Sequence, residues 1–137
     1  MPDRLVLIVD DDADTREMLQ TMLQIMVGVR TSLAEDGEVA LQHVAEERPD
    51  LILLDLRLPK RDGAVVLRQL KADPATSEIP VIVLTTGALP TDHEVARAAG
   101  CDDYLDKPFH VATLEKKVRS QLGLGPDHGR GARSRVA

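Results

Sequence analysis

Short apolar runs alternate along the chain with stretches in which apolar residues recur every three or four positions. A continuous apolar run bounded by turn residues predicts a buried strand, whereas the wider spacing predicts a helix that packs through one face. The predicted strands are residues 5–9, 29–33, 51–55, 79–84 and 103–106. The predicted helices follow them at residues 14–27, 37–47, 64–72, 91–99 and 111–122.

The same spacing predicts which side of each helix faces the core. The second strand is the least apolar of the longer strands, so we expect it near a sheet edge. The fourth helix is short of apolar residues, so we expect it to pack loosely. The inward residues of the other helices are predicted to be Met18, Leu19, Met22, Leu23 and Met26, then Ala40, Leu41, Val44 and Ala45, then Val66, Leu67 and Leu70, and last Val111, Leu114, Val118 and Leu122.

Five successive pairs of strand and helix predict an α/β fold. This alternation produces a doubly wound parallel sheet with helices on both faces, joined by right-handed crossovers. At 137 residues the chain is long enough to form one domain with its own core. We expect residues 1–122 to form that domain and residues 123–137, rich in glycine and arginine, to be a flexible basic tail.

Charge and composition narrow the possible classes of protein. The net charge is −6, and three arginines against one aspartate give residues 123–137 a charge of +2, which leaves −8 on residues 1–122. A domain this acidic is a poor non-specific nucleic-acid binder. No apolar stretch approaches membrane-spanning length, the N-terminus lacks a signal-peptide pattern, and a single cysteine excludes an intramolecular disulfide. We therefore expect a cytoplasmic protein.

Residues suited to phosphoryl chemistry follow the predicted strands directly. Asp10 and Asp11 follow the first strand, Asp55 ends the third, Thr85 follows the fourth and Lys107 follows the fifth. The carboxyl ends of parallel strands meet at one edge of a sheet, where ligands bind. Three close carboxylates repel one another unless a cation lies among them, and Mg²⁺ prefers oxygen ligands. An aspartate can accept a phosphoryl group as an acyl phosphate. The residues alone leave two interpretations open, a phosphoryl site or ordinary strand-end caps.

Taken together, these residues and their neighbours resemble a known family. The order Asp10-Asp11, then Asp55 before Leu-Pro-x-x-Asp-Gly, then Thr85 after a Pro-Val-Ile-Val-Leu strand, then Lys107-Pro108-Phe109, resembles the receiver domain of bacterial two-component response regulators. The resemblance covers about residues 4–122 and is nearest to stand-alone chemotaxis receivers. It implies a flavodoxin-like sheet with strand order 2-1-3-4-5.

The resemblance also implies a role for each residue of the motif. Asp55 is the phosphoacceptor. Asp11 binds Mg²⁺ directly, Asp10 acts mainly through a metal-bound water, and Arg57 contributes its backbone carbonyl, which leaves its side chain free to vary. Thr85 and Lys107 contact phosphoryl oxygens, and the Lys107-Pro108 peptide is cis. Tyr104 occupies the position of an aromatic side chain that turns inward when Thr85 moves.

The function implied is a phosphorylation-dependent switch. A sensor histidine kinase or a histidine phosphotransfer protein donates the phosphoryl group, and the face formed by the fourth helix, fifth strand and fifth helix changes its affinity for a downstream protein or a second copy of the chain. Beyond its own phosphorylation and dephosphorylation no enzyme activity is expected. The chain ends soon after the fifth helix, so we expect a single-domain regulator without direct DNA binding and without a membrane partner.

Several alternatives remain open at this stage. The domain could be an effector, a phosphorelay shuttle or a docking module that works without phosphorylation. A phosphatase of the haloacid dehalogenase type needs a second aspartate two residues after the nucleophile, and position 57 is Arg. Asp12 is interpreted as an exposed helix-start residue, and Lys60 and Arg61 as a solvated loop. None of His43, His93, His110 and His128 is interpreted as a metal ligand or phosphohistidine.

Overall fold

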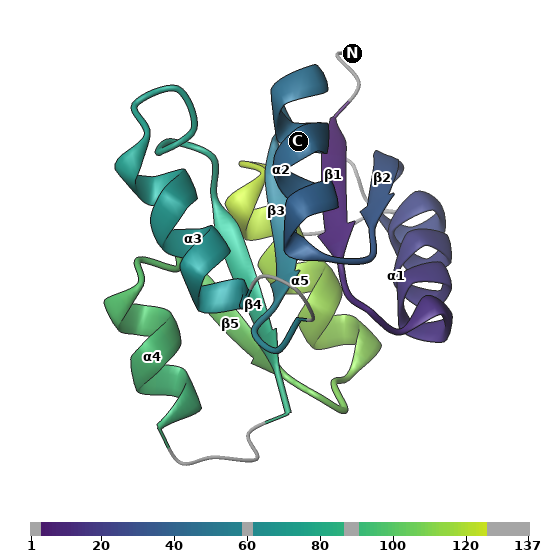
Figure 1. The fold of residues 1–137 in the computed structure, drawn as a ribbon. Helices are drawn as coiled ribbons and strands as arrows, with labels where there is room; N and C mark the ends of the chain where they lie inside the picture. The colour runs from purple at the N-terminus through teal and green to yellow at the C-terminus, as the bar shows by residue number, and fades with distance from the viewer. Residues whose placement is uncertain (1–3, 59–61, 87–90, 126–137) are drawn as a thin grey trace.

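Five parallel strands form one sheet in the order β2-β1-β3-β4-β5, which confirms the predicted topology (Figure 1). The computed structural model describes residues 4–58, 62–86 and 91–125. The strands are β1 (Leu5–Val9), β2 (Arg30–Ala34), β3 (Leu51–Asp55), β4 (Val81–Thr85) and β5 (Asp103–Asp106). The helices are α1 (Ala13–Met26), α2 (Gly37–Glu46), α3 (Gly63–Ala72), α4 (Asp92–Ala98) and α5 (Val111–Gln121).

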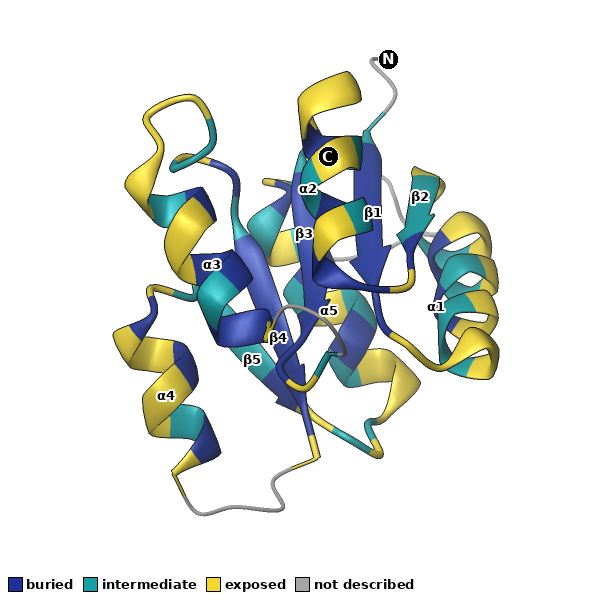
Figure 2. Cartoon of the chain, viewed as in Figure 1, coloured by how far each residue is buried: buried dark blue, intermediate teal, exposed yellow. Residues whose placement is uncertain are grey.

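Two apolar layers, one on each face of the sheet, hold the helices in place. Successive side chains of a strand point to opposite faces, so Leu7, Ile52 and Val83 pack towards α2, α3 and α4, while Ile8, Leu53 and Leu84 pack towards α1 and α5. All five residues in each of β1, β3 and β4 are buried (Figure 2). The sequence pattern of uninterrupted apolar runs follows from this burial on both faces.

Local sequence signals place several element boundaries. The Asp36 carboxylate accepts a hydrogen bond from the backbone N–H of Val39 at 2.9 Å and caps α2. Strand β4 begins at Val81, two residues later than predicted, because Pro80 has no N–H to donate. The Pro80 carbonyl instead accepts from the backbone N–H of Ile52 at 3.0 Å. Strand β2 lies at the sheet edge, as its composition predicted.

The predicted inward faces of three helices were too wide. In α1 only Leu19 and Leu23 are buried, and Met18 is 44% exposed. Met18 lies about 100° around the helix from Leu19, so it lies to the side of the stripe that Leu19 and Leu23 bury against the sheet. Ala45 of α2 is exposed for the same reason. Val111, the first residue of α5, is 42% exposed.

Three of the predictions concern segments outside the described residues. They are the flexible tail beyond residue 125, the loop at Lys60 and Arg61, and His128. Within residues 4–58, 62–86 and 91–125, no helix combines the length and apolar character that a membrane crossing requires.

Candidate functional site

The register of the sheet brings the predicted site residues to its carboxyl edge. Val9 of β1 is aligned with Leu54 of β3, so Asp10 and Asp55 come next at the same level on neighbouring strands. Asp55 is in turn aligned with Leu84 of β4, and Thr85 follows one residue later. Parallel pairing therefore collects on one edge the side chains that are far apart in the sequence.

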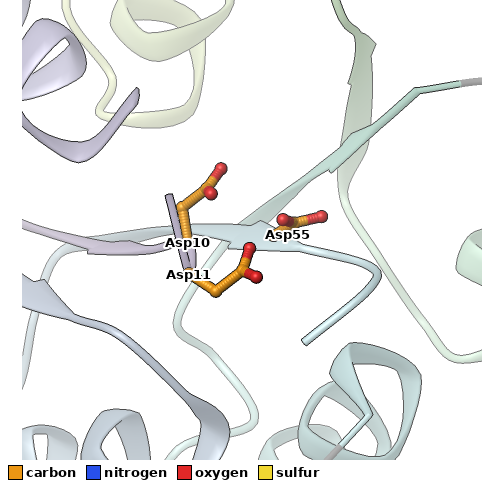
Figure 3. A group of neighbouring side chains, drawn as sticks. All are labelled: Asp10, Asp11 and Asp55. Atoms are coloured by element: carbon orange, nitrogen blue, oxygen red, sulfur yellow. The ribbon is translucent and has the colours of Figure 1, made fainter. Parts of the chain in front are cut away.

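Three carboxylates meet there (Figure 3). Asp10, Asp11 and Asp55 each offer an oxygen atom, and these three atoms lie within 4.8 Å of one another. Asp10 is fully buried and Asp55 is 6% exposed, whereas Asp11 is open to solvent. Asp12, by contrast, lies outside this group and its carboxylate accepts from the Thr15 hydroxyl at 2.6 Å, so it is an exposed helix-start residue as expected.

Backbone hydrogen bonds orient the two buried carboxylates. The N–H of Asp12 donates to Asp10 Oδ1 at 2.9 Å, and the N–H of Arg57 donates to Asp55 Oδ1 at 3.1 Å. Each bond holds Oδ1 of its carboxylate and leaves Oδ2 to other partners in the site. The geometry therefore keeps an Asp55 oxygen at the sheet edge.

Lys107 supplies the positive charge of the site. Its Nζ lies 2.7 Å from Asp10 Oδ2 and 3.4 Å from Asp55 Oδ2, and its side chain is 21% exposed. Burial disfavours the ammonium form, but the hydrogen bond to Asp10 and the charge of Asp55 outweigh it, so the pKa of Lys107 is raised above its usual range. Lys107 is therefore a cation throughout the neutral range. The Lys107-Pro108 peptide is cis, as the resemblance implied.

One lysine does not neutralise three carboxylates. Burial raises the pKa of Asp55, and the charge of Asp10 adds to the rise, against the Arg57 N–H and the charge of Lys107. The ionised form of Asp55 is thus disfavoured in this buried position. A divalent cation bound nearby would reduce the free-energy cost of ionising it. The available ligands are carboxylate oxygens, the type that Mg²⁺ prefers. The residues present therefore fit a magnesium site.

The backbone behind Asp55 leaves no room for a side chain at Gly63. A Cβ atom on Gly63 would lie 2.2 Å from the carbonyl oxygen of Asp55 and 2.7 Å from that of Leu56. The Gly63 N–H also donates to the Leu56 carbonyl at 3.1 Å. This close approach explains the Asp-Gly pair of the motif, since Asp62 caps α3 through the Ala64 N–H at 2.8 Å.

Thr85 is held by a residue that the sequence patterns did not single out. Its hydroxyl donates to Asp92 Oδ2 at 3.3 Å, and the guanidinium of Arg57 contacts Asp92 Oδ1 at 2.6 Å. The Arg57 side chain, which the resemblance left without a role, is thus occupied. Asp92 is 1% exposed although it begins a polar helix. The sequence signal that could have identified Asp92 as a partner of Thr85 is a carboxylate at the start of the helix that follows the Thr85 strand.

Tyr104, the expected aromatic switch residue, lies half-buried on β5 beneath α4. Its ring stacks on His93 with the centroids 4.1 Å apart, and His93 Nε2 lies 2.6 Å from Asp106 Oδ1. His93 therefore has a structural partner on each side.

Comparison with known proteins shows which family the chain belongs to. The response regulator receiver domain family matches residues 6–119. The chain belongs to this family. Receiver domains are signalling domains of two-component systems rather than classical enzymes, and the Asp10, Asp11 and Asp55 cluster suits the magnesium binding expected of them.

Among curated relatives of this receiver domain are two longer regulators. The response regulator MprA of Mycolicibacterium vanbaalenii is 39% identical over 132 residues, which are 96% of this chain and 55% of MprA. The DNA-binding response regulator MtrA of Mycolicibacterium paratuberculosis is 42% identical over 122 residues, which are 89% of this chain and 52% of MtrA. The chain thus spans about half the length of these relatives.

Solved receiver domains share its fold closely. The receiver domain of the sensor histidine kinase PA1611 of Pseudomonas aeruginosa, with a magnesium ion in its active-site cleft, has a TM-score of 0.82 and 34% identity, covering 89% of this chain and 99% of that one. The chemotaxis response regulator CheY4 of Vibrio cholerae has a TM-score of 0.81 and 29% identity, covering 88% and 99%.

The carboxylate geometry makes a prediction for Asp11→Asn. Removing one of the three clustered carboxylate charges should weaken Mg²⁺ binding about tenfold, the effect of losing one bond to a charged group. Asp14→Asn is the matched control, because Asp14 is an exposed acid in the first turn of α1 outside the cluster. Isothermal titration calorimetry measures the Mg²⁺ affinity of both variants. Equal affinities would show that Asp11 is not a ligand of the ion.

Proposed function

We propose that this receiver domain accepts a phosphoryl group on Asp55 in a Mg²⁺-dependent reaction and thereby switches its binding to a protein partner. The observation that carries the proposal is the position of the Asp55 carboxylate, which lies beside the carboxylates of Asp10 and Asp11 and 3.4 Å from the Lys107 ammonium. Its Oδ1 is held by the Arg57 N–H, which presents Oδ2 for reaction.

Each residue has a chemical task in this scheme. An oxygen of Asp55 attacks the phosphorus of a phosphohistidine donor, and the bond from phosphorus to the imidazole nitrogen breaks with its electrons going to that nitrogen. Lys107 neutralises a phosphoryl oxygen, and Thr85 donates a hydrogen bond to another. Asp10, Asp11, Asp55 and the Arg57 carbonyl would hold Mg²⁺, which when bound offsets the charge of the phosphoryl oxygens.

The partners proposed follow from this chemistry. The donor is a sensor histidine kinase or a histidine phosphotransfer protein, and the output surface is the face of α4, β5 and α5. The charge of −8 on residues 1–122 disfavours contact with DNA phosphates, so we propose that the receiver itself acts through a downstream protein or a second copy. The relatives of twice its length include a DNA-binding regulator, and any such activity would belong to another domain.

Two candidate roles differ in the lifetime of the acyl phosphate. An effector keeps the phosphoryl group long enough to bind its target, whereas a relay shuttle transfers it rapidly to a histidine phosphotransfer protein. The test of switching is an amide NMR spectrum before and after acetyl phosphate with Mg²⁺. Shifts concentrated in α4, β5 and α5 support the proposal, and phosphorylation without any change in these elements would leave a module that carries phosphate without switching.

Lys107→Ala should separate phosphorylation from the structural response. Asp55 and the three-carboxylate cluster remain, so some labelling by acetyl phosphate should persist. The cation that pairs with the phosphoryl group is lost, so the shifts in α4, β5 and α5 should become much smaller. Lys116→Ala is the control, since Lys116 lies on α5 with no contact to the cluster among the described ion pairs. An unchanged response in Lys107→Ala would reduce Lys107 to a surface residue.

A further inference from the structure

A buried carboxylate on α4 connects the phosphoacceptor region to the helix that borders the proposed output surface. Asp92, whose side chain is 2% exposed, accepts from Thr85 through one oxygen and pairs with Arg57 through the other. The same Arg57 donates its backbone N–H to Asp55. One residue of α4 therefore contacts both the threonine of the site and the side chain two residues after Asp55.

We propose that Asp92 is a positioning residue that stabilises the unphosphorylated conformation by holding Thr85 and Arg57 at the start of α4. The inference rests on the proposed function, because it needs a phosphoryl group on Asp55 to compete with Asp92. In this proposal Asp92 couples the phosphoryl group on Asp55 to the first turn of α4.

Competition for Thr85 follows from hydrogen-bond chemistry. A threonine hydroxyl has one proton to donate. In this structure that proton is directed at Asp92, across 3.3 Å. Donation to a phosphoryl oxygen on Asp55 requires Thr85 to leave Asp92. The 3.3 Å separation is long for a bond from a hydroxyl, so this contact breaks at small cost.

Competition for Arg57 follows from charge. The Arg57 guanidinium pairs with Asp92 at 2.6 Å while 53% of its side chain is exposed, so it has space to turn. A phosphoryl group two residues away in sequence adds negative charge on the Asp55 side. When Thr85 and Arg57 both shift towards that charge, Asp92 is left as a buried anion without partners. Such a group is strongly disfavoured, so the start of α4 moves to expose it.

The residue after Asp92 extends the effect to β5. His93 covers the Tyr104 ring at 4.1 Å and contacts Asp106 at 2.6 Å. Figure 1 shows α4 at the β4–β5 end of the sheet, and Ala96 is its fully buried apolar residue. Because few apolar contacts hold this seven-residue helix, loss of the Asp92 contacts displaces its first turn and uncovers Tyr104.

The test compares Asp92→Asn with Glu94→Gln, an acid-to-amide change at an exposed position in the same turn. The probe is beryllofluoride, a phosphoryl mimic, titrated in the presence of Mg²⁺. Asp92→Asn should bind beryllofluoride about fivefold more tightly than the wild type. This is the effect expected when one ordinary hydrogen bond that opposes binding is removed. Glu94→Gln should match the wild type. Affinity for Mg²⁺ alone should be the same in all three proteins, because Asp92 is outside the three-carboxylate cluster.

Arg57→Gln is a second variant, at an exposed position. It tests the role of Asp92 if Asp92→Asn fails to fold. It should also tighten beryllofluoride binding, because losing the pair with the buried Asp92 carboxylate outweighs losing a solvent-screened attraction to the probe. The double variant should gain less than the two effects added, because both act through one contact. In Asp92→Asn, amide hydrogen exchange should be faster than in the wild type at Val95, whose N–H donates to the Thr91 carbonyl at 2.9 Å. A merely structural role for Asp92 does not tighten binding.

The outcomes separate the two proposals. If the wild type binds beryllofluoride and neither Asp92→Asn nor Arg57→Gln binds it more tightly than Glu94→Gln, the role of Asp92 is wrong and the receiver function stands. If the wild type neither binds beryllofluoride nor accepts phosphate from acetyl phosphate, the proposed function is wrong and the inference falls with it.

Discussion

Asp55→Asn is expected to abolish phosphorylation while leaving the fold intact. The amide has no anionic oxygen to attack phosphorus, and the other buried carboxylate of the cluster, Asp10, is held by Lys107 at 2.7 Å. Radiolabelled acetyl phosphate with Mg²⁺ should label the wild type and give only background on the variant. Retained labelling at the wild-type level would place the acceptor elsewhere.

The same variant should be at least as stable as the wild type in the absence of Mg²⁺. Burial raises the pKa of Asp55 in the folded protein. A raised carboxyl pKa means that stability from this group is present at low pH and is lost as pH rises through the folded pKa. At neutral pH the ionised form is therefore a cost to folding, and Asn removes it. Urea denaturation at pH 7 measures the difference, and a large loss of stability would show that Asp55 is needed for folding.

Gly63→Ala is expected to destabilise the protein by about 3 kcal/mol, the upper part of the usual range for overpacking. The added methyl group would lie 2.2 Å from the Asp55 carbonyl oxygen and 2.7 Å from that of Leu56. Both obstacles are backbone atoms, so no side-chain rotation relieves the contact. Since these carbonyls lie in and just after β3, the backbone that carries the acceptor must move.

Gly125→Ala is the matched control, because nothing lies within 4 Å of the Cβ position there. Urea denaturation followed by far-ultraviolet circular dichroism should show a lower midpoint for Gly63→Ala and no change for the control. Labelling of folded Gly63→Ala by acetyl phosphate should also slow, since Asp55 is displaced. Wild-type stability in Gly63→Ala would mean that the turn after β3 is looser than the structure shows.

The sequence predicted the parts of this molecule that depend on apolar periodicity and on residues that end helices and strands. Uninterrupted apolar runs at Leu5–Val9 and Leu51–Leu54 predicted strands buried on both faces, and the structure confirms them. The weaker run before Ala34 predicted an edge strand, which β2 is. The placement of Asp10, Asp11 and Asp55 together followed because parallel strands end at a common edge.

Contacts between side chains on different elements could not be read from these patterns. Spacing places Asp92 at a helix start but does not say that its carboxylate is buried between Thr85 and Arg57. Periodicity likewise assigned Met18 to the inner face, although only Leu19 and Leu23 of α1 are buried. The family motif includes Gly63 in its Asp-Gly pair, and the structure gives the reason, because the carbonyl of Asp55 lies directly beside it.

The most direct test of the central claim locates the phosphoryl group on the wild-type chain. The protein is incubated with acetyl phosphate, with and without Mg²⁺, weighed intact, and then treated with borohydride, which reduces an acyl phosphate and marks its residue for peptide mass spectrometry. One adduct that requires Mg²⁺, with the reduced residue at position 55, is the predicted result. An adduct at another residue, or equal labelling without Mg²⁺, would contradict the account.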